Sequence, residues 1–305
     1  MTATAEAQII PIRSSSEPPA VLAPTADVFE ARANRFEQLA DGHSLGDWLR
    51  FLAALSRAQH AALRALPTLP LPDAAARAQA REHRMPALPA QSWPRDAAWH
   101  EVLRRLAAAV TPAAPEAPRA DLGRIATLPA KRMEALAERV LHTELYGDDA
   151  ALLPYVGAAL QVLWTGLAMR LTPTITALDV PGVCPCCGFL PVASVVKTVG
   201  ETANLRYLHC ALCNTEWNLV RVKCAACDAT EGISYRELAG DAVKQPGAVR
   251  AETCDSCRSY LKIVYQEKGG VDPVADDLAT LALDILVDEA GYARAGPNLL
   301  LVPGA

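Results

Sequence analysis

Eight of the nine cysteines form four Cys-x-x-Cys pairs within residues 184–257. The pairs are Cys184/Cys187, Cys210/Cys213, Cys224/Cys227 and Cys254/Cys257. A Cys-x-x-Cys turn places two thiolates on one side of a tight loop, at the separation that a tetrahedral metal ion requires. Two such turns complete a closed shell of four sulfur ligands. The spacing therefore predicts two four-cysteine metal sites, with all eight paired cysteines as ligands.

The order of the pairs indicates which of them share a metal. Residues 188–209 separate the first two pairs and residues 228–253 the last two, and each gap suits a β-hairpin that returns the second turn to the first. Residues 214–223 are expected to form a strand linking the two units. Sequential pairing gives one site with Cys184, Cys187, Cys210 and Cys213 and another with Cys224, Cys227, Cys254 and Cys257. A crossed arrangement, which joins the first pair to the third, is the alternative. The repeated plan favours sequential pairing.

The metal itself stays open, because four thiolates suit both zinc and rubredoxin-type iron. Zinc would make the sites structural, whereas iron would permit one-electron chemistry. A redox dithiol could explain one pair but not readily four at ribbon spacing.

Gly188 is expected to relieve crowding in the first turn. Cys186, inside that turn, is a spare ligand, a redox-sensitive thiol or, as we favour, a small apolar filler.

Composition and charge favour a cytoplasmic protein without catalytic residues. The net charge is -5, so there is no basic excess to attract nucleic acid. The N-terminus lacks a basic segment followed by an apolar run, so no secretory signal is expected. In a reducing compartment, Cys-x-x-Cys pairs indicate metal sites rather than disulfides. The histidines are scattered, and we find no P-loop, dinucleotide-binding or serine-hydrolase motif. No catalytic or cofactor-binding residue is therefore assigned.

An α+β fold is expected, because helical and strand patterns occupy different parts of the chain. Residues 1–24 read as a flexible tail and residues 25–180 as a helical domain. Its helices are predicted from Asp27, from Ser44 as an N-cap, from near Ser92 with Pro94 in its first turn, and over 129–146 and 152–171. Residues 67–91 and 111–118 are broken by prolines. The uncharged run 152–169 is interpreted as a buried helix, so no stable membrane insertion is expected.

The remaining parts are tandem zinc-ribbon or rubredoxin-like modules, with four cysteines each, over 181–270 and a C-terminal helix and tail over 271–305. Strands are predicted at 191–199, 205–209, 217–222, 233–238 and 260–266. The helix is expected to begin at Asp272-Pro273 and to stop near Gly291. Asp276, Asp277 and Asp284 are expected on its solvated face, and His209 is interpreted as a surface residue of a strand.

Several runs around and after the cysteines resemble the formate dehydrogenase accessory protein family, FdhE. They are CPCCG (184–188), PVAS (191–194), LRYLHCALC (205–213), EW (216–217), RVKC (221–224), YLKIVYQEK (260–268) and VADDLA (274–279). The resemblance is dense from residue 184 to the C-terminus. Over residues 1–183 it rests on length and helical character.

The resemblance implies a cytoplasmic assembly factor for respiratory formate dehydrogenase. Such a factor contacts the catalytic subunit of that enzyme before export and binds iron or zinc through the eight paired cysteines. A rubredoxin-like electron-transfer protein is the main alternative, and a nucleic-acid-binding zinc ribbon is a weaker one, because acidic residues offset Arg206, Arg221 and Lys223. Self-association of the chain stays open.

Overall fold

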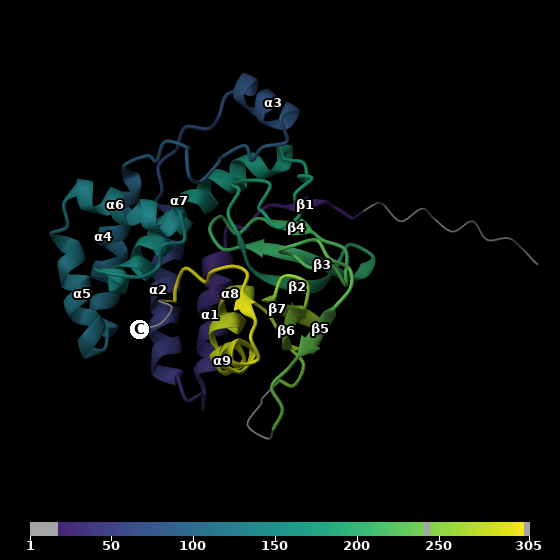
Figure 1. The fold of residues 1–305 in the computed structure, drawn as a ribbon. Helices are drawn as coiled ribbons and strands as arrows, with labels where there is room; N and C mark the ends of the chain where they lie inside the picture. The colour runs from purple at the N-terminus through teal and green to yellow at the C-terminus, as the bar shows by residue number, and fades with distance from the viewer. Residues whose placement is uncertain (1–17, 241–244, 302–305) are drawn as a thin grey trace, which may run out of the picture.

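The computed structural model describes residues 18–240 and 245–301. Within them a group of helices packs against one mixed β-sheet, and two C-terminal helices lie between the two (Figure 1). This arrangement confirms the α+β class. The division of the chain into four parts stays a prediction.

Seven helices precede the cysteine region. They are α1 (Val28–Ala40), α2 (Gly46–Arg64), α3 (Ala74–Glu82), α4 (Ala98–Val110), α5 (Glu116–Ala126), α6 (Ala130–Leu141) and α7 (Leu153–Leu171). Their boundaries correct several predictions. Leu45, not Ser44, is the N-cap of α2, and it makes no side-chain cap. The helix predicted near Ser92 begins only at Ala98, because turns occupy the preceding residues. The proline-rich segment 111–118 contains the start of α5, since proline is tolerated in the first turn of a helix.

Helix α7 forms the centre of the helical group, as predicted for its apolar run. The stretch Ala150–Thr174 is long and apolar enough to cross a membrane by length and composition, but 83% of its most apolar window is buried inside the fold. Gln161, its central polar side chain, is satisfied there. Its amide donates to the carbonyl oxygen of Ala211 at 2.8 Å, and its carbonyl accepts from Gln59 at 3.0 Å.

The sheet contains eight strands: β1 (Val21–Leu22), β2 (Pro191–Val199), β3 (Thr202–Cys210), β4 (Glu216–Asn218), β5 (Ile233–Arg236), β6 (Val249–Cys254), β7 (Ser259–Tyr265) and β8 (Ala293–Arg294). The order is β1-β4-β3-β2-β7-β6-β5, with β8 beside β7. The antiparallel pairs β2–β3 and β6–β7 are joined where β2 and β7 pair in parallel, with Ser194 opposite Ile263. The two cysteine modules therefore share one sheet and are not separate folding units. The expected linking strand 214–223 shortens to β4.

Strand β1 corrects the prediction that residues 1–24 form a flexible tail. Val21 pairs with Trp217 of β4, and the Tyr207 hydroxyl donates to the carbonyl oxygen of Pro19 at 2.8 Å. The first part of that prediction, residues 1–17, lies outside the described residues.

The predicted C-terminal helix is two helices, α8 (Pro273–Leu278) and α9 (Leu281–Glu289). The Asp272 carboxylate caps α8 by accepting from the amides of Val274 and Ala275, as the Asp-Pro start suggests. The break follows from Lys262 of β7, which is buried and donates to the carbonyl oxygens of Asp277 and Thr280. A buried ammonium group at these carbonyls replaces the helix hydrogen bonds that would continue the turn.

The aspartates expected on a solvated face are instead in an ionic network. Asp276 and Asp277 are buried, and Asp284 is largely so. Arg35 of α1 pairs with Asp276 at 2.5 Å, and Lys262 and Arg294 pair with both Asp277 and Asp284. The prediction failed because the basic partners come from distant segments, which helical periodicity does not reveal.

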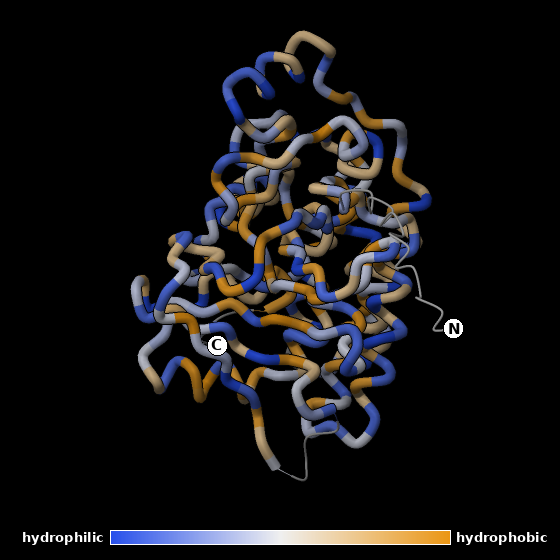
Figure 2. The backbone as a smooth tube through the Cα atoms, turned by 90° about the vertical axis from the view of Figure 1, so that its right-hand side faces the viewer, coloured by the Kyte–Doolittle hydropathy of each residue, from blue (hydrophilic) through white to orange (hydrophobic). Residues whose placement is uncertain are grey.

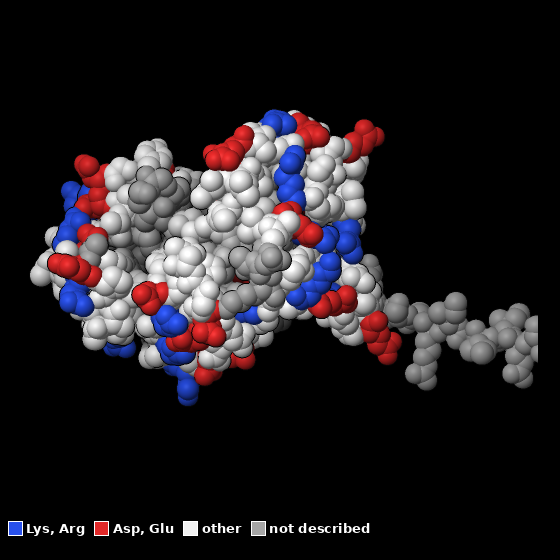
Figure 3. Space-filling view, turned by 90° about the horizontal axis from the view of Figure 1, so that it is seen from below, with Lys and Arg blue, Asp and Glu red and all other residues white. Residues whose placement is uncertain are grey.

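Hydropathy and charge follow this packing. In Figure 2 hydrophobic stretches run through the body, whereas blue hydrophilic residues alternate with pale orange ones in the part that projects at the top, around α3. On the face seen from below, Lys and Arg side chains lie next to Asp and Glu around a broad uncharged area (Figure 3). That face therefore presents a mixed surface.

Candidate metal centres

The eight paired cysteines meet in two groups of four. Cluster 1 is Cys184, Cys187, Cys210 and Cys213; cluster 2 is Cys224, Cys227, Cys254 and Cys257. Within each cluster the four sulfur atoms lie within 4.8 Å of one another. The grouping is the sequential one, and the crossed arrangement is not what the fold adopts. The ninth cysteine, Cys186, belongs to neither group.

Sulfur separations fit a tetrahedral ion. The Sγ atoms of Cys184 and Cys213 are 3.5 Å apart, as are those of Cys187 and Cys210. In cluster 2 the pairs Cys224–Cys257 and Cys227–Cys254 are both 3.7 Å apart. A metal–sulfur bond of about 2.3 Å in a tetrahedron places sulfurs roughly 3.8 Å apart, whereas a disulfide needs about 2.05 Å. Both donor sets fit one zinc or iron ion each.

All four turns use the same backbone device. The residue directly after the second cysteine has a left-handed conformation each time, with φ of 72° at Gly188, 56° at Asn214, 66° at Asp228 and 55° at Arg258. In three turns the first cysteine amide donates to the carbonyl oxygen five residues on, as from Cys184 to Phe189. Gly188 has the predicted role. Asn and Asp tolerate this conformation, while Arg258 is held there by stacking on Tyr292, 4.1 Å from the ring centroid.

Cluster 1 lies inside the protein, between the sheet and the helical group. All four of its cysteines are at most 1% exposed. Its outer side is covered by residues 86–90, where the amides of Leu88 and Ala90 donate to the carbonyl oxygens of Cys186 and Cys187 at 2.9 Å. Its other turn rests on α7 through the Gln161–Ala211 hydrogen bond. A metal here would be sealed from solvent.

Cys186 is fully buried next to cluster 1. The pKa of Cys186 is raised well above the usual thiol value, mainly by a hydrogen bond to Cys213 and to a smaller extent by burial. Cys186 therefore stays a neutral thiol. This placement matches the filler interpretation. Burial likewise raises the pKa of Cys184 and Cys187, whereas at Cys213 burial is outweighed by hydrogen bonds from neighbouring thiols, which lower its pKa. Without metal, Cys213 is therefore more acidic than Cys184 and Cys187.

Cluster 2 lies at the protein surface. Cys224 and Cys254 are buried, but Cys227 and Cys257 are exposed. Burial raises the pKa of Cys224 to about 12. Burial alone would raise the pKa of Cys257 too, yet the hydroxyl of Ser259, 2.9 Å from its sulfur, and the neighbouring thiols hold that pKa at about 7. Of the two exposed cysteines, Cys257 is thus the one whose pKa is lowered, whereas at Cys227 a backbone hydrogen bond at Ala229 is outweighed by burial and the neighbouring thiols, which raise its pKa.

A buried polar network anchors cluster 1 to the helices. His209, immediately before Cys210, is 4% exposed, which corrects its interpretation as a surface residue. Its Nε2 lies 3.1 Å from the Oδ1 of Asn214, which also accepts from Arg32 of α1 at 2.7 Å. Arg32 in turn donates to the Asp272 carboxylate at 3.2 Å, and Asn214 donates to Thr165 of α7 at 2.8 Å. Four elements therefore converge directly beside one turn of cluster 1.

A second buried pair connects the two clusters. Arg206 of β3 bonds Glu252 of β6 at 2.7 Å and the carbonyl oxygen of Lys223, next to Cys224, at 2.8 Å. Both Arg206 and Glu252 lie within the sheet and are nearly inaccessible to solvent. Sequence reasoning counted Arg206 among the basic residues near the cysteines, but here it is a structural brace. Only its position two residues before the buried Leu208 in a strand hinted at burial.

These features define a helical scaffold joined to a sheet with two ribbon-type clusters of four cysteines each. Sequence models of the FdhE N-terminal, central and C-terminal domains match residues 17–178, 183–221 and 222–301. The chain belongs to the FdhE family. It is 40% identical over 290 residues to "Protein FdhE homolog" from Pseudomonas aeruginosa, covering 94% of each chain. The homologue from Edwardsiella ictaluri is 42% identical over 283 residues, covering 91% of this chain and 89% of the relative.

The fold is also similar to a solved structure. "The crystal structure of the FdhE protein from Pseudomonas aeruginosa" superimposes with a TM-score of 0.84 at 38% sequence identity. The match covers 94% of this chain and all of that chain. Because both the family models and the relatives reach the helical part, the resemblance first seen from residue 184 onward extends over nearly the whole chain.

Proposed function

We propose that this chain is a cytoplasmic assembly factor for respiratory formate dehydrogenase, acting on the catalytic subunit of that enzyme before export. The observation that carries the proposal is the pair of preformed four-cysteine clusters in a chain of the FdhE family. In this role the protein binds its client and needs no catalytic turnover of its own. The helices supply the scaffold and the clusters fix the shape of the sheet.

Each cluster, in this proposal, holds one iron or zinc ion through its four thiolates. The near-tetrahedral sulfur separations support this, as do amide hydrogen bonds to the sulfurs, such as those from Leu212 and Cys213 to Cys210 at 3.4 Å. Such bonds stabilise thiolate charge and tune the redox potential of an iron site. The chemistry that the ion supplies is structural cross-linking for zinc, or electron exchange for iron.

A second function, rubredoxin-like electron transfer to the client, is favoured by one specific observation. Cys227 and Cys257 bring two ligand sulfurs of cluster 2 to the surface, where a redox partner can approach. Anaerobically purified protein with iron would then show reversible bleaching of a sulfur-to-iron charge-transfer colour. A protein that holds only zinc after anaerobic isolation would remove this second function and leave the assembly role.

The test is an anaerobic pull-down of the tagged protein from cells that express formate dehydrogenase, with the metal content measured in the same eluate. We expect the catalytic subunit to be recovered by wild type. We expect it to be lost with Cys187→Ser/Cys210→Ser, which empties cluster 1, and retained with Cys186→Ala, which replaces a cysteine outside both clusters. Failure to recover the expressed subunit with wild type would contradict the proposed function.

A further inference from the structure

Helix α3 is unusual in burying none of its residues. It stands away from the body (Figure 1), and proline-containing segments precede and follow it, with Pro67, Pro70 and Pro72 before it and Pro86 and Pro89 after it. An isolated helix of nine residues is marginal in water, because most helical stability in proteins comes from packing. Local support comes from Asp73, whose carboxylate accepts the Ala76 amide at 2.7 Å. Within the described part of the chain, the helix therefore lacks the packing partner that would fix it.

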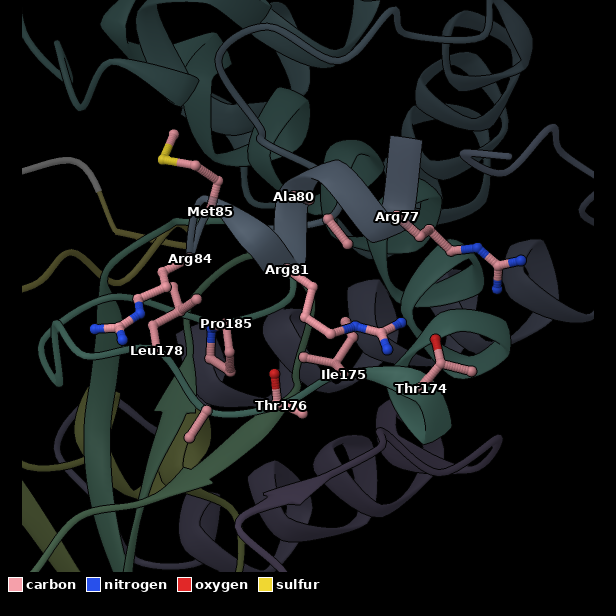
Figure 4. A pocket seen from close by; sticks show the side chains of 12 residues that line it. Arg77, Ala80, Arg81, Arg84, Met85, Thr174, Ile175, Thr176, Leu178 and Pro185 are labelled. Carbon is pink, nitrogen blue, oxygen red and sulfur yellow. The ribbon is translucent and has the colours of Figure 1, made fainter. Parts of the chain in front are cut away.

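One face of α3 is basic. Arg77 and Arg81 are four residues apart, so their side chains leave the same side of the helix, and Arg84 follows in the turn after it. They line a cleft whose opposite wall is the Thr174–Leu178 segment, with Pro185 beside it. Figure 4 shows Arg81 extending toward Ile175, Arg77 extending sideways above Thr174 at one end of the cleft, and Arg84 at the other end, near Leu178.

Two of these guanidinium groups lack an acidic partner among the residues that the structure describes. Arg84 pairs with Asp179, and Arg77 donates through Nε only to the carbonyl oxygen of Asp73 at 3.3 Å. For Arg77 and Arg81, no carboxylate forms an ion pair among residues 18–240 and 245–301. Two guanidinium groups on one side of the helix, neither paired with a carboxylate of the described residues, offer N–H donors to an incoming carboxylate.

The size of the cleft points to a side chain rather than a small-molecule substrate. Its volume is about 50 Å³, which is room for a few water-sized groups, while substrate pockets usually measure about 300–1,000 Å³. A single carboxylate fits. Further residues of an acidic segment would run along the exposed helix, which can adjust because it buries none of its own residues.

The cleft is tied to cluster 1. Pro185 lies between the ligand Cys184 and the buried Cys186, and the segment leaving α3 donates from Leu88 and Ala90 to the carbonyls of Cys186 and Cys187. The Cβ position of Gly188 is only 3.0 Å from Pro86. A ligand held by α3 would therefore sit against the metal-binding turn.

We propose that α3 and the Thr174–Leu178 segment form the client-docking site, and that it captures an acidic segment of the client polypeptide through Arg77 and Arg81. This inference rests on the proposed function, since it names the surface through which an assembly factor meets its client. Docking orders α3 and covers the outer side of cluster 1.

The test measures binding of the full chain to the purified catalytic subunit of formate dehydrogenase, at two salt concentrations. R77E/R81E should bind at least about tenfold more weakly than wild type, since two surface charge pairs are reversed. R77K/R81K, which keeps both charges but removes the guanidinium forks, should bind with intermediate affinity. R104E/K131E, which reverses two basic residues of α4 and α6 outside the cleft, should bind like wild type. Hydrogen exchange at the α3 amides should slow in the complex.

The outcomes separate the two proposals. If wild type does not bind the subunit, the proposed function itself fails. If wild type and R77E/R81E bind equally well, the docking site is wrong while the assembly role stands. Slowed α3 exchange with inorganic phosphate alone, together with unchanged client binding by R77E/R81E, would identify a free-anion site and overturn the docking proposal. Because α3 buries none of its residues, R77E/R81E should keep the wild-type melting temperature, which excludes misfolding as the cause of weaker binding.

Discussion

Clusters 1 and 2 are each built from two Cys-x-x-Cys turns with a residue in the left-handed conformation after each turn, yet they have opposite surroundings. In cluster 1 all four sulfurs are buried beneath residues 86–90 and against α7. In cluster 2 two of the four cysteines face solvent. The motif thus fixes the local geometry, whereas the elements packed outside it decide whether a metal is sealed or accessible. Cluster 1 is placed as a structural joint and cluster 2 as a surface site.

The largest expected difference follows from emptying each cluster. Cys187→Ser/Cys210→Ser should prevent stable folding, because structural zinc sites contribute about 10–16 kcal/mol, comparable with the total stability of a domain. Cys227→Ser/Cys257→Ser should leave a folded protein with one metal ion per chain and a lower melting temperature, since the two replaced side chains face solvent. Thermal unfolding and metal analysis of both variants check this. Equal destabilisation by the two would remove the distinction.

A smaller effect is expected from the charges beside each cluster. Asp272→Ala leaves Arg32 buried without its carboxylate and uncaps α8, so we expect a loss of about 3–5 kcal/mol. Lys223→Ala removes a more exposed pair with Asp228 next to cluster 2 and should change stability by less than about 1 kcal/mol. Denaturant unfolding of the metal-loaded variants provides the measurement. A near-zero effect of Asp272→Ala would show that the Arg32 network does not hold the scaffold to cluster 1.

The two clusters should release their metal ions at different rates when a chelator is added. A chelator reaches a partly exposed site directly, whereas the metal of cluster 1 becomes accessible only after local opening of residues 86–90. We expect two phases of metal release, the first of one equivalent and without loss of helical circular dichroism. The Cys227→Ser/Cys257→Ser variant should show the slow phase alone. A single phase in wild type would contradict unequal sealing.

Much of this architecture could be predicted from the sequence, and the failures have physical reasons. Cysteine spacing predicted both groupings, and β-branched runs predicted β2 with its bounds unchanged. The sequence patterns did not predict β6, whose polar residues alternate with small ones. They also did not predict the two-residue strands β1 and β8, which form only by pairing with distant partners. Sequence spacing did not reveal the exposure of either group, since what covers each cluster comes from elsewhere in the chain.

Buried charges were the other limit. Asp276, Asp277, Arg206 and His209 looked like surface residues because isolated charges rarely occupy a core. The two aspartates and Arg206 are buried in pairs whose members are far apart in sequence, such as Arg35 with Asp276, whereas His209 is buried against the nearby Asn214 and Glu216. The periodicity of apolar residues in a strand or helix indicates which face of that element is buried. It does not indicate that an oppositely charged side chain from another element lies against that face. Only tertiary structure supplies that information.

Reactivity toward an alkylating reagent should sharpen the comparison after mild chelation. With cluster 2 emptied, Cys257 has a pKa of about 7, so its thiolate fraction, and hence its rate, should rise as pH increases through 7 and then level off. Cys224, with a pKa of about 12, and the buried thiols of cluster 1 should react more slowly throughout. Peptide mass spectrometry after labelling at pH 6 and pH 8 would identify the first cysteine modified. Preferential labelling in cluster 1 would reverse the assignment of the exposed site.

The smallest expected effect tests the left-handed residue that both clusters share. Gly188→Ala places a Cβ at φ of 72° and 3.0 Å from the Pro86 side chain, so it should cost about 1–2 kcal/mol at cluster 1. Asp228→Gly, at the equivalent position of cluster 2, relieves strain but loses the Lys223 pair, so it should change stability by less than about 0.5 kcal/mol. Chemical denaturation with saturating metal distinguishes the two. If Gly188→Ala proved as silent as Asp228→Gly, the cover over cluster 1 would be able to shift freely, and its tight sealing by residues 86–90 would have to be abandoned.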